Sequence, residues 1–309
     1  MKTFRVRICL ALMTVLFASS VSAQNLDPTI RVGATVAVSD HVYMIPDENK
    51  PIIPNVGFVV GNRATLVIDT GLGEENGRIV LSEAIRLAPE NKLYIASSHA
   101  HPEHDLGAMA FPKDATVIRS ANQILDIKEM DMRLVRMFAG FSLRSAELLE
   151  GAYFRPADVI YTDSMRLDLG GVHVRIIEAG PNHTLGDTAF LVEEDELLFT
   201  GDVVMNEFPM PLNPRTTIQH WLDTLDMLQG LGAKTIVPCH YAVGSTELIE
   251  NYRSYFTTVR DRANALADEG KSEEEAAEIL KVELAEMFNT WKDPNRIPRT
   301  VSVVYRERK

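Results

Sequence analysis

Short apolar runs rich in β-branched residues alternate along this chain with stretches that repeat apolar residues at helical spacing. Apolar runs of about four to eight residues between turn-forming residues are typical of strands, and the longer repeats are typical of amphipathic helices. The runs predict strands at residues 30–38, 41–45, 56–60, 65–68, 92–96, 115–118, 159–161, 165–167, 172–177, 188–192, 197–200 and 234–238.

These strands fall into two groups, and helical stretches are interleaved with each group. No linker rich in Pro and Gly separates the groups. Two sheets covered on the outside by helices, in one domain, fit this order better than a simple parallel sheet. The pattern therefore predicts a mixed α/β (α+β) fold.

The helical stretches carry recognisable faces and start signals. Residues 77–87 place Ile79, Ile85 and Leu87 at helical spacing. A helix is predicted to begin at Thr216, with Gln219 as its capping-box partner. The long stretch 121–150 carries Met130, Met132, Met137, Phe138 and Phe141, a pattern that favours core packing over the alternative of a substrate-pocket wall.

The chain is predicted to be helical from residue 247 onward. A second capping box, Ser272 with Glu275, precedes an apolar stripe that we expect to pack on the body of the protein. This stripe consists of Ala276, Ile279, Leu280, Leu284, Met287 and Phe288. Residues 300–305 are predicted to form an edge strand or a tail.

The first 23 residues have the pattern of a signal peptide. Lys2, Arg5 and Arg7 precede an apolar stretch, residues 8–17, and small residues end at Ala23. We expect cleavage before Gln24 and export of the mature chain to a bacterial periplasm, rather than the alternative of an uncleaved anchor. No later stretch predicts a membrane span.

Charge and cysteine content narrow the classes of function. The net charge is −12, and removal of residues 1–23 takes away three basic residues and no acidic ones. This acidic balance argues against nucleic acid as a substrate and leaves nuclease action as the weakest alternative, because phosphate binding needs a basic face. The mature chain keeps one cysteine, Cys239, so it has no internal disulfide.

Polar residues of metal-binding type recur where a predicted strand gives way to a loop. Asp69 and Asp202 each end a strand, and residues 97–107 read Ser-Ser-His-Ala-His-Pro-Glu-His-Asp-Leu-Gly after another. Five of the eight histidines belong to this set, namely His99, His101, His104, His183 and His240. The other three, His41, His173 and His220, are predicted to be ordinary hydrogen-bonded or solvated residues.

Counting ligands gives two metal groups. His99, His101 and His183 would hold one zinc ion. Alternate residues of an extended segment point the same way, so the imidazoles of His99 and His101 face one ion. Glu103, His104 and His240 would serve a second ion, and Asp202 can bridge them. A closed structural zinc site is the weaker interpretation, since there are too many ligands for one ion.

These motifs resemble those of the metallo-β-lactamase superfamily. The resemblance runs from about residue 56 to about residue 241 and rests on five motifs in order: Val67-Ile-Asp-Thr-Gly71, His99-Ala-His-Pro-Glu-His104, Asn182-His-Thr-Leu-Gly186, Phe199-Thr-Gly-Asp202 and Val237-Pro-Cys-His240. It implies a four-layered αββα sandwich over residues 24–250, with residues 251–309 as a C-terminal helical extension packed on the same domain. It also implies two Zn²⁺ ions and gives Asp69 the role of orienting the cluster instead of binding metal.

Two positions depart from the family's pattern. The family's aspartate is Glu103 here, and Asn182 stands before His183 where glycine is usual. Glutamate is one methylene longer and is still a hard oxygen donor, so the occupancy of the second metal position depends on it.

The predicted function is hydrolysis of an ester, thioester or amide, β-lactams included, by a metal-bridging hydroxide, with Glu103, Asp202 and Asp69 as the catalytic group. The substrate would be a small molecule, and the sequence leaves the oligomeric state open.

The class of hydrolase remains open among glyoxalase-II-like enzymes, β-lactamases and exported zinc hydrolases associated with quinoprotein systems. Asn206 and Tyr241 are predicted to be structural, with lining of the pocket as the alternative. The rival function is a metal-binding or iron redox protein on the same scaffold, altered by Glu103.

Overall fold

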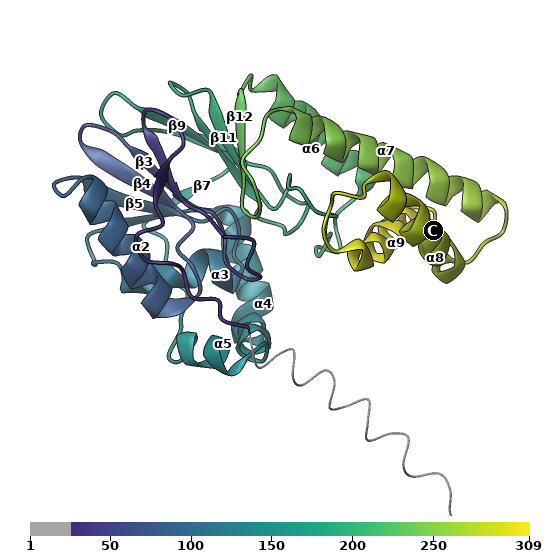
Figure 1. The fold of residues 1–309 in the computed structure, drawn as a ribbon, viewed down its shortest axis with the longest axis horizontal. Helices are drawn as coiled ribbons and strands as arrows, with labels where there is room; N and C mark the ends of the chain where they lie inside the picture. Colours follow the sequence, from purple (N-terminus) through teal and green to yellow (C-terminus); the bar gives the residue numbers. More distant parts are fainter. Residues whose placement is uncertain (1–25) are drawn as a thin grey trace, which may run out of the picture.

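The β-branched runs form strands of two sheets in the computed structural model, which describes residues 26–309 (Figure 1). The predicted signal peptide, residues 1–23, lies outside the described residues. None of the described helices is long and apolar enough to cross a membrane.

The first sheet has seven strands in sequence order. They are β1 (Val36–Ala37), β2 (Val42–Ile45), β3 (Val56–Val60), β4 (Ala64–Ile68), β5 (Lys92–Ala96), β6 (Thr116–Ser120) and β7 (Val159–Tyr161). Pairing is antiparallel from β1 to β4 and parallel from β4 to β7. The carboxyl ends of β4 and β5 therefore lie at the same edge.

The second sheet has five strands in the order β12-β11-β10-β9-β8. They are β8 (Ser164–Asp168), β9 (His173–Glu178), β10 (Thr188–Val192), β11 (Leu197–Gly201) and β12 (Thr235–Pro238). Only the β11–β12 pair is parallel in this sheet, so these two strands also end at one edge.

Helices cover both outer faces of the sheets. The helices of the first half are α2 (Gly73–Leu87), α3 (Pro102–Asp105), the 3₁₀ helix η1 (Leu106–Ala110), α4 (Ala121–Ala139) and α5 (Leu143–Leu148). Those of the second half are α6 (Ile218–Gly230), α7 (Glu247–Asp268), α8 (Glu273–Met287), the 3₁₀ helix η2 (Pro294–Arg296) and α9 (Ile297–Glu307). Figure 1 shows α7, α8 and α9 together as an arm beside the sandwich.

Three apolar layers hold the sandwich together. Leu66 and Ile68 of the first sheet meet Phe190 and Phe199 of the second in the central layer. Val80 of α2 belongs to a second cluster on the outer face of the first sheet. A third cluster joins the outer face of the second sheet to α6, α7, α8 and α9. This arrangement confirms the predicted four-layered αββα sandwich.

The C-terminal helices share the third cluster with the sandwich. Phe256, Leu280 and Val301 are buried in it together with Leu198 and Ile236 of the second sheet. The expected boundary between residues 250 and 251 falls inside α7. The division into a family domain and an extension stays a prediction.

Several predicted details are wrong, and tertiary packing explains each. Residues 300–305 belong to α9 and are neither strand nor tail, because Val301 and Val304 face the third cluster at helical spacing. Ile85 is 47% exposed, and α2 buries Val80 and Ala84 instead. Within residues 30–38, only Val36–Ala37 pairs as a strand.

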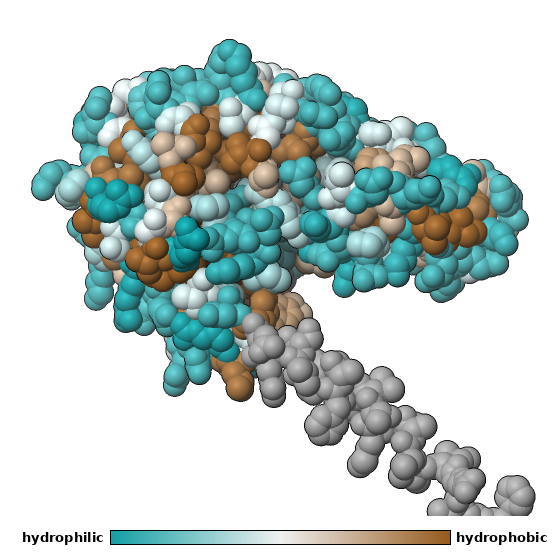
Figure 2. All heavy atoms as spheres, in the orientation of Figure 1, coloured by the Kyte–Doolittle hydropathy of each residue, from teal (hydrophilic) through white to brown (hydrophobic). Residues whose placement is uncertain are grey.

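The helix signals are correct at one capping box and wrong at the other. Ser272 and Glu275 form the expected capping box of α8. The cap of α6 is Thr217, whose hydroxyl accepts from the backbone N–H of His220, whereas Thr216 donates to the carbonyl of Asn182 at 2.6 Å. Met287 is 60% exposed and does not join the predicted stripe. Figure 2 shows a patch of hydrophobic surface on the arm formed by the C-terminal helices.

Candidate metal centre

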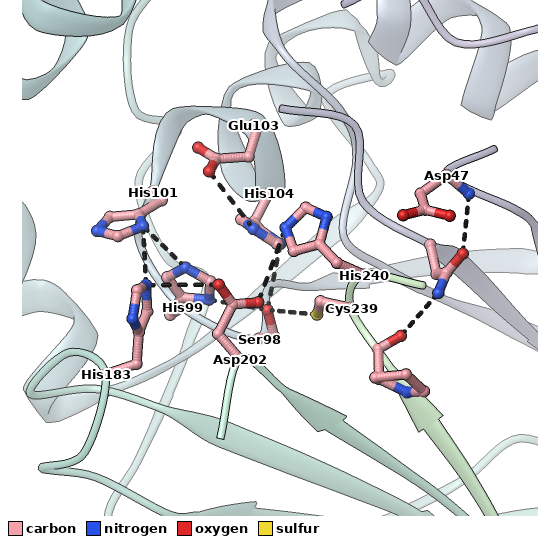
Figure 3. Close-up of polar contacts among 12 residues, drawn as sticks. Asp47, Ser98, His99, His101, Glu103, His104, His183, Asp202, Cys239 and His240 are labelled. Carbon is pink, nitrogen blue, oxygen red and sulfur yellow. Dashed lines mark hydrogen bonds and ion pairs between the residues drawn. The ribbon is translucent and has the colours of Figure 1, made fainter. Parts of the chain in front are cut away.

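The predicted ligands converge at the edge of the sandwich where strands of both sheets end. His99 follows β5, and His101 caps the short helix α3, whose first turn carries Glu103 and His104. His183 lies in the loop between β9 and β10, and Asp202 and His240 follow β11 and β12. All seven side chains point toward one another (Figure 3).

Three histidine nitrogens form the first group. Nε2 of His99 lies 3.0 Å from Nδ1 of His101, and Nε2 of His183 lies 3.2 Å from that same Nδ1. The remaining nitrogen of His183 donates to the carbonyl of Met210 at 2.7 Å, which leaves a lone pair on its Nε2. Nitrogens about 2.0–2.1 Å from one zinc ion, at tetrahedral angles, are separated by distances close to these.

Glu103, His104 and His240 form the second group. Oε1 of Glu103 lies 3.7 Å from Nε2 of His104. Nδ1 of His240 faces the carbonyl of Ile53 at 2.9 Å, so Nε2 is again the nitrogen that points into the centre. The longer side chain of Glu103 thus reaches this group.

Asp202 lies between the two groups. Its Oδ2 is 3.5 Å from Nε2 of His183, and its Oδ1 is 3.8 Å from Nε2 of His240. Asp202 also groups with His99 and His104. One carboxylate therefore faces both groups, as a bridging ligand would.

Asp69 stands behind the second group. Its Oδ2 accepts from Nδ1 of His104 at 2.9 Å, and its Oδ1 accepts from the backbone N–H of Ser98 at 2.7 Å. The thiol of Cys239 is a third neighbour at 3.1 Å. Asp69 thus touches the supporting nitrogen of His104 and leaves Nε2 free.

The pKa values follow from burial and neighbouring charge. Burial lowers the pKa of His99, His101 and His183, so these imidazoles stay neutral, which is the form that binds metal. Burial also disfavours the charged form of His104, but the Asp69 carboxylate outweighs it and raises the pKa of His104 to about 9. The carboxylates around His104 thus favour a positive charge at the position of its imidazole.

The two carboxylates of the centre respond differently. Burial raises the pKa of Glu103 to about 7. Burial acts in the same direction on Asp202, but the surrounding histidines, His240 foremost, lower its pKa to about 2. A cation beside Glu103 would favour its carboxylate form again.

Unpartnered polar atoms show that the donor set fits metal ions. Within residues 26–309, Oε2 of Glu103, Nε2 of His104 and Oδ1 of Asp202 are buried and have no hydrogen-bond partner. Leaving buried polar atoms unpaired is costly unless something else binds them. All three point into the centre, and imidazole nitrogen with carboxylate oxygen is a donor set that zinc accepts.

Sequence reasoning missed the residues that hold this loop from behind. Arg119 of β6 is 2% exposed and forms a buried ion pair with Asp105, which also accepts from the hydroxyl of Ser97 at 2.9 Å. Nε2 of Gln123 donates to the carbonyl of Ser97 at 2.7 Å. Two sequence signals could have found this pair: an arginine inside the apolar strand β6, and a further carboxylate, Asp105, directly after His104.

A second missed set supports His240. The side-chain amide of Asn55 donates to the carbonyls of Pro238 and Tyr241, and Oδ2 of Asp47 accepts from the backbone N–H of Tyr241. Tyr241 has φ of 68°, a conformation that needs such support. No pattern in the sequence of the loop after β2 marks these residues.

A cavity of about 530 Å³ opens over the centre. His101, Glu103, His183, Asp202 and His240 line it, and Tyr241 does too, whereas Asn206 does not. Its apolar wall includes Met137, Phe138 and Phe141. Core packing, the favoured interpretation of this stripe, holds for Phe138, which is buried, and the alternative of a pocket wall holds as well, because all three side chains line the cavity.

An ordinary role was predicted for all three remaining histidines, and hydrogen-bonded partners are present for two of them. His41 pairs with Asp195 at 2.6 Å, and His173 pairs with Glu194 at 2.6 Å, and none of these residues lines the cavity. His220 lies on α6, and its Nε2 is buried without a partner among the described residues.

Comparison with known proteins gives relatives of low identity. The chain is 24% identical to the atrochrysone carboxyl ACP thioesterase of Aspergillus fumigatus over 190 residues, which cover 60% of this chain and 50% of that protein. The sec-alkylsulfatase Pisa1 from Pseudomonas sp. is similar in structure, with a TM-score of 0.68 and 15% identity over 89% of this chain and 50% of that chain. This chain therefore spans about half the length of each.

A metallo-beta-lactamase family protein from Thermus thermophilus is similar over most of both chains, with a TM-score of 0.62, 21% identity and coverage of 88% and 94%. A metallo-beta-lactamase from Pontibacter korlensis gives a TM-score of 0.58 at 18% identity, over 72% of this chain and 98% of that one. Residues 49–240 match the sequence model of the metallo-beta-lactamase superfamily, and the matched range includes every residue of the centre. The chain belongs to the metallo-beta-lactamase superfamily.

Proposed function

We propose that this chain is a zinc-dependent hydrolase that holds two zinc ions and cleaves an ester, thioester or amide bond. The observation that carries the proposal is the position of Asp202. Its two carboxylate oxygens face His183 of the first group and His240 of the second, so one side chain serves both groups. A carboxylate shared in this way supports a centre in which each of the two positions holds a cation.

Each side chain then has a definite task. His99, His101 and His183 hold the first zinc ion, and Glu103, His104 and His240 hold the second. Zinc, when bound, supplies Lewis acidity that polarises a carbonyl and lowers the pKa of water. Asp69 keeps the proton of His104 on Nδ1, away from the centre.

The surroundings suit hydrolysis of a substrate with an apolar part. The carboxylates and imidazoles of the centre are buried apart from the half-buried His240, so the reacting group leaves bulk water when it enters the cavity. The apolar wall from α4 offers a place for the rest of the molecule. The names of the Aspergillus and Pseudomonas relatives, a thioesterase and an alkylsulfatase, agree with hydrolysis as the general reaction.

The rival is a metal-binding or iron redox protein in which Glu103 alters the second group. The structure gives one observation that favours the hydrolase. Oε1 of Glu103 lies within 3.7 Å of Nε2 of His104, and its Oε2 is buried and unpartnered among the described residues. The glutamate therefore offers an oxygen to the second group, as the shorter aspartate would.

The test combines elemental analysis with a hydrolysis screen on one purified sample. The screen includes nitrocefin, lactones, acyl thioesters and phosphodiesters. We expect two zinc ions per chain and turnover of an ester, thioester or amide. One iron per chain without turnover would support the rival instead.

Variants separate the centre from a contaminating activity. Turnover should fall in His101→Ala and in Asp202→Ala. Loss of a residue that only supports a metal ligand costs roughly 10–100-fold, and loss of a ligand itself should cost more. His173→Ala is the matched control, because His173 lies in a partly exposed His-Glu group away from the cavity. Full turnover in both centre variants would overturn the proposal.

We also propose that the chain is exported to a bacterial periplasm. The basic residues before the apolar stretch 8–17 and the small residues up to Ala23 support this. N-terminal sequencing of the protein recovered from a periplasmic extract should begin at Gln24. Recovery of the intact N-terminus from the cytoplasm would contradict the proposal.

A further inference from the structure

The cavity above the metal centre has two unlike walls, and they define what can fill it. One wall is apolar and comes from α4, the segment after it, and Leu212 in the stretch between β11 and α6. The other comes from η2 and α9 and carries Arg296 and Arg299. The second wall lies outside residues 49–240, so the family match does not describe it.

The apolar wall leaves large side chains in contact with water. Met137 is 52% exposed and Leu212 is 39% exposed, and both line the cavity. Covering such surface is favourable by about 25 cal/mol per Å². An apolar group of a ligand placed here would bury both side chains.

Arg296 is not available to a ligand, because its charge is already used. It pairs with Glu207 and Asp293, at 2.5 Å and 3.0 Å. Glu207 is 2% exposed, so this pair is part of the packed structure. Arg296 therefore shapes the wall.

Arg299 is different. It is exposed, it lines the cavity, and among residues 26–309 its guanidinium makes no hydrogen bond or ion pair with another side chain. Lys50 also lines the cavity, but it pairs with Glu48 at 3.2 Å. Arg299 is thus the one lining cation of the described chain that lacks an acidic partner.

The position of Arg299 in its helix also favours an anionic ligand. It lies in the first turn of α9, which contains no acidic residue. The start of a helix carries a partial positive charge, so anions are favoured there and a lysine or arginine is disfavoured. An anionic ligand at this end of the cavity would satisfy both the guanidinium and the helix.

We propose that the substrate of this centre is an anionic amphiphile: an ester or thioester whose acyl group is apolar and whose leaving group carries an anionic substituent. The acyl group lies against Met137 and Leu212, the scissile carbonyl lies over the metal centre, and Arg299 binds the anion. The proposal rests on the hydrolase function proposed above. It makes the C-terminal helices a determinant of specificity.

A pair of chromogenic esters tests this assignment on the zinc-loaded, full-length mature protein. The two substrates are nitrophenyl hexanoate and the same ester with a carboxylate on the nitrophenyl ring. For the wild type, kcat/KM should be roughly tenfold or more higher with the carboxylate, in line with one hydrogen-bonded charge pair. Arg299→Gln should lose this preference, because the carboxylated ester then has no cation to pair with.

A control variant removes the same charge elsewhere. Arg260 lies on α7, pairs only with its neighbour Asp261 among the described residues, and does not line the cavity. Arg260→Gln should keep the full preference for the charged ester. An equal loss in Arg260→Gln would show a general effect of protein charge and overturn the proposal.

The apolar half is tested by chain length. Met137→Gln should reduce the advantage of the hexanoyl over the acetyl ester by roughly threefold to tenfold, because less apolar surface is covered. Met137 is half exposed, so the variant is expected to fold. An unchanged advantage would remove the apolar wall from the proposal.

Binding of unreactive analogues separates this proposal from the proposed function. The probes are the hexyl ethers of the same two phenols, which cannot be hydrolysed, measured by calorimetry. Tighter binding of the carboxylated ether, lost in Arg299→Gln, supports the anion site even when no ester is turned over. Equal binding of the two ethers by the wild type overturns the site, whatever the hydrolysis screen shows.

Discussion

Nδ1 of His104 lies 2.9 Å from Oδ2 of Asp69, and both side chains are completely buried. Asp69 also accepts from the backbone and the hydroxyl of Ser98, so it joins two parts of the loop after β5. The ring of His104 is thereby fixed in one orientation and one tautomer. Support of this kind commonly governs how tightly the histidine binds a metal.

Asp69→Asn should weaken the second zinc ion selectively. The side-chain amide nitrogen of the new asparagine would replace one carboxylate oxygen that now accepts from His104 or Ser98. An amide nitrogen cannot accept these hydrogen bonds, so His104 loses its orienting partner. We expect the affinity for the second zinc ion to fall by roughly 10–100-fold, with the first little changed. Titration of the metal-free protein with zinc, against a chelator of known affinity, measures both steps.

The matched control for Asp69→Asn is Asp195→Asn. Asp195 pairs with His41 at 2.6 Å, in the same way but away from the cavity. Zinc binding should be unchanged in this variant. Equal weakening of both zinc ions by Asp69→Asn would show that Asp69 supports the whole edge of the sandwich and not His104 in particular.

Glu103→Gln should reduce the zinc content from two ions per chain toward one. The amide has nearly the shape of the carboxylate but lacks its charge, so it competes poorly for a cation. Elemental analysis after dialysis against a fixed low zinc concentration gives the count. Glu103→Asp restores the charge with a shorter reach, and it should hold more zinc than Glu103→Gln. A wild type with a single zinc ion that Glu103→Gln does not change would contradict this role.

The sequence predicted the layers, and it marked the side chains that converge at one edge of the sandwich, because both depend on local patterns. Apolar runs, several of them β-branched, marked β3, β4, β5 and β10, and polar residues after predicted strands marked every member of the two candidate metal groups. Strand ends meet at one edge by topology, so residues far apart in sequence could be placed together.

What the sequence did not predict depends on contacts between distant elements. The residues 300–305 read as a strand because they are β-branched, yet packing against α7 and α8 makes them helical. Arg299 has no motif, and its place on the cavity wall follows from how α9 folds back toward the centre. The same holds for Asn55, which acts through two backbone carbonyls after β12.

Arg119→Met should destabilise the protein strongly. The substitution leaves the carboxylate of Asp105 buried without its cation, and removal of one partner of a buried pair costs about 3–5 kcal/mol. Urea unfolding of the metal-free protein measures the free energy. The double variant Asp105→Leu with Arg119→Met should recover much of the loss, since it removes both charges.

An exposed pair provides the comparison for Arg119. Arg63 and Asp168 are paired at 2.8 Å but are 68% and 49% exposed. Arg63→Met should have no measurable effect on unfolding, because water screens such pairs. A loss in Arg119→Met no larger than that in Arg63→Met would contradict the importance of the buried pair.

Asp126 should make the stability of the protein depend on pH. Burial raises its pKa to about 6 from the ordinary value of 3.8, although the backbone N–H of Gly186 at 2.8 Å opposes part of this effect. Between about pH 4 and pH 6 the folded state therefore binds this proton more tightly than the unfolded state does, and stability falls as the pH rises through that range.

Asp126→Asn removes this titration and keeps an oxygen that can accept from Gly186. Because one pKa unit corresponds to about 1.36 kcal/mol, the stability of the wild type relative to the variant should fall by roughly 2–3 kcal/mol between about pH 4 and pH 7. Urea unfolding of both proteins in the metal-free form, at several pH values, gives this difference directly. A constant difference across the range would show that the carboxyl group titrates alike in the folded and unfolded chain, and that its burial next to Gly186 carries no electrostatic cost.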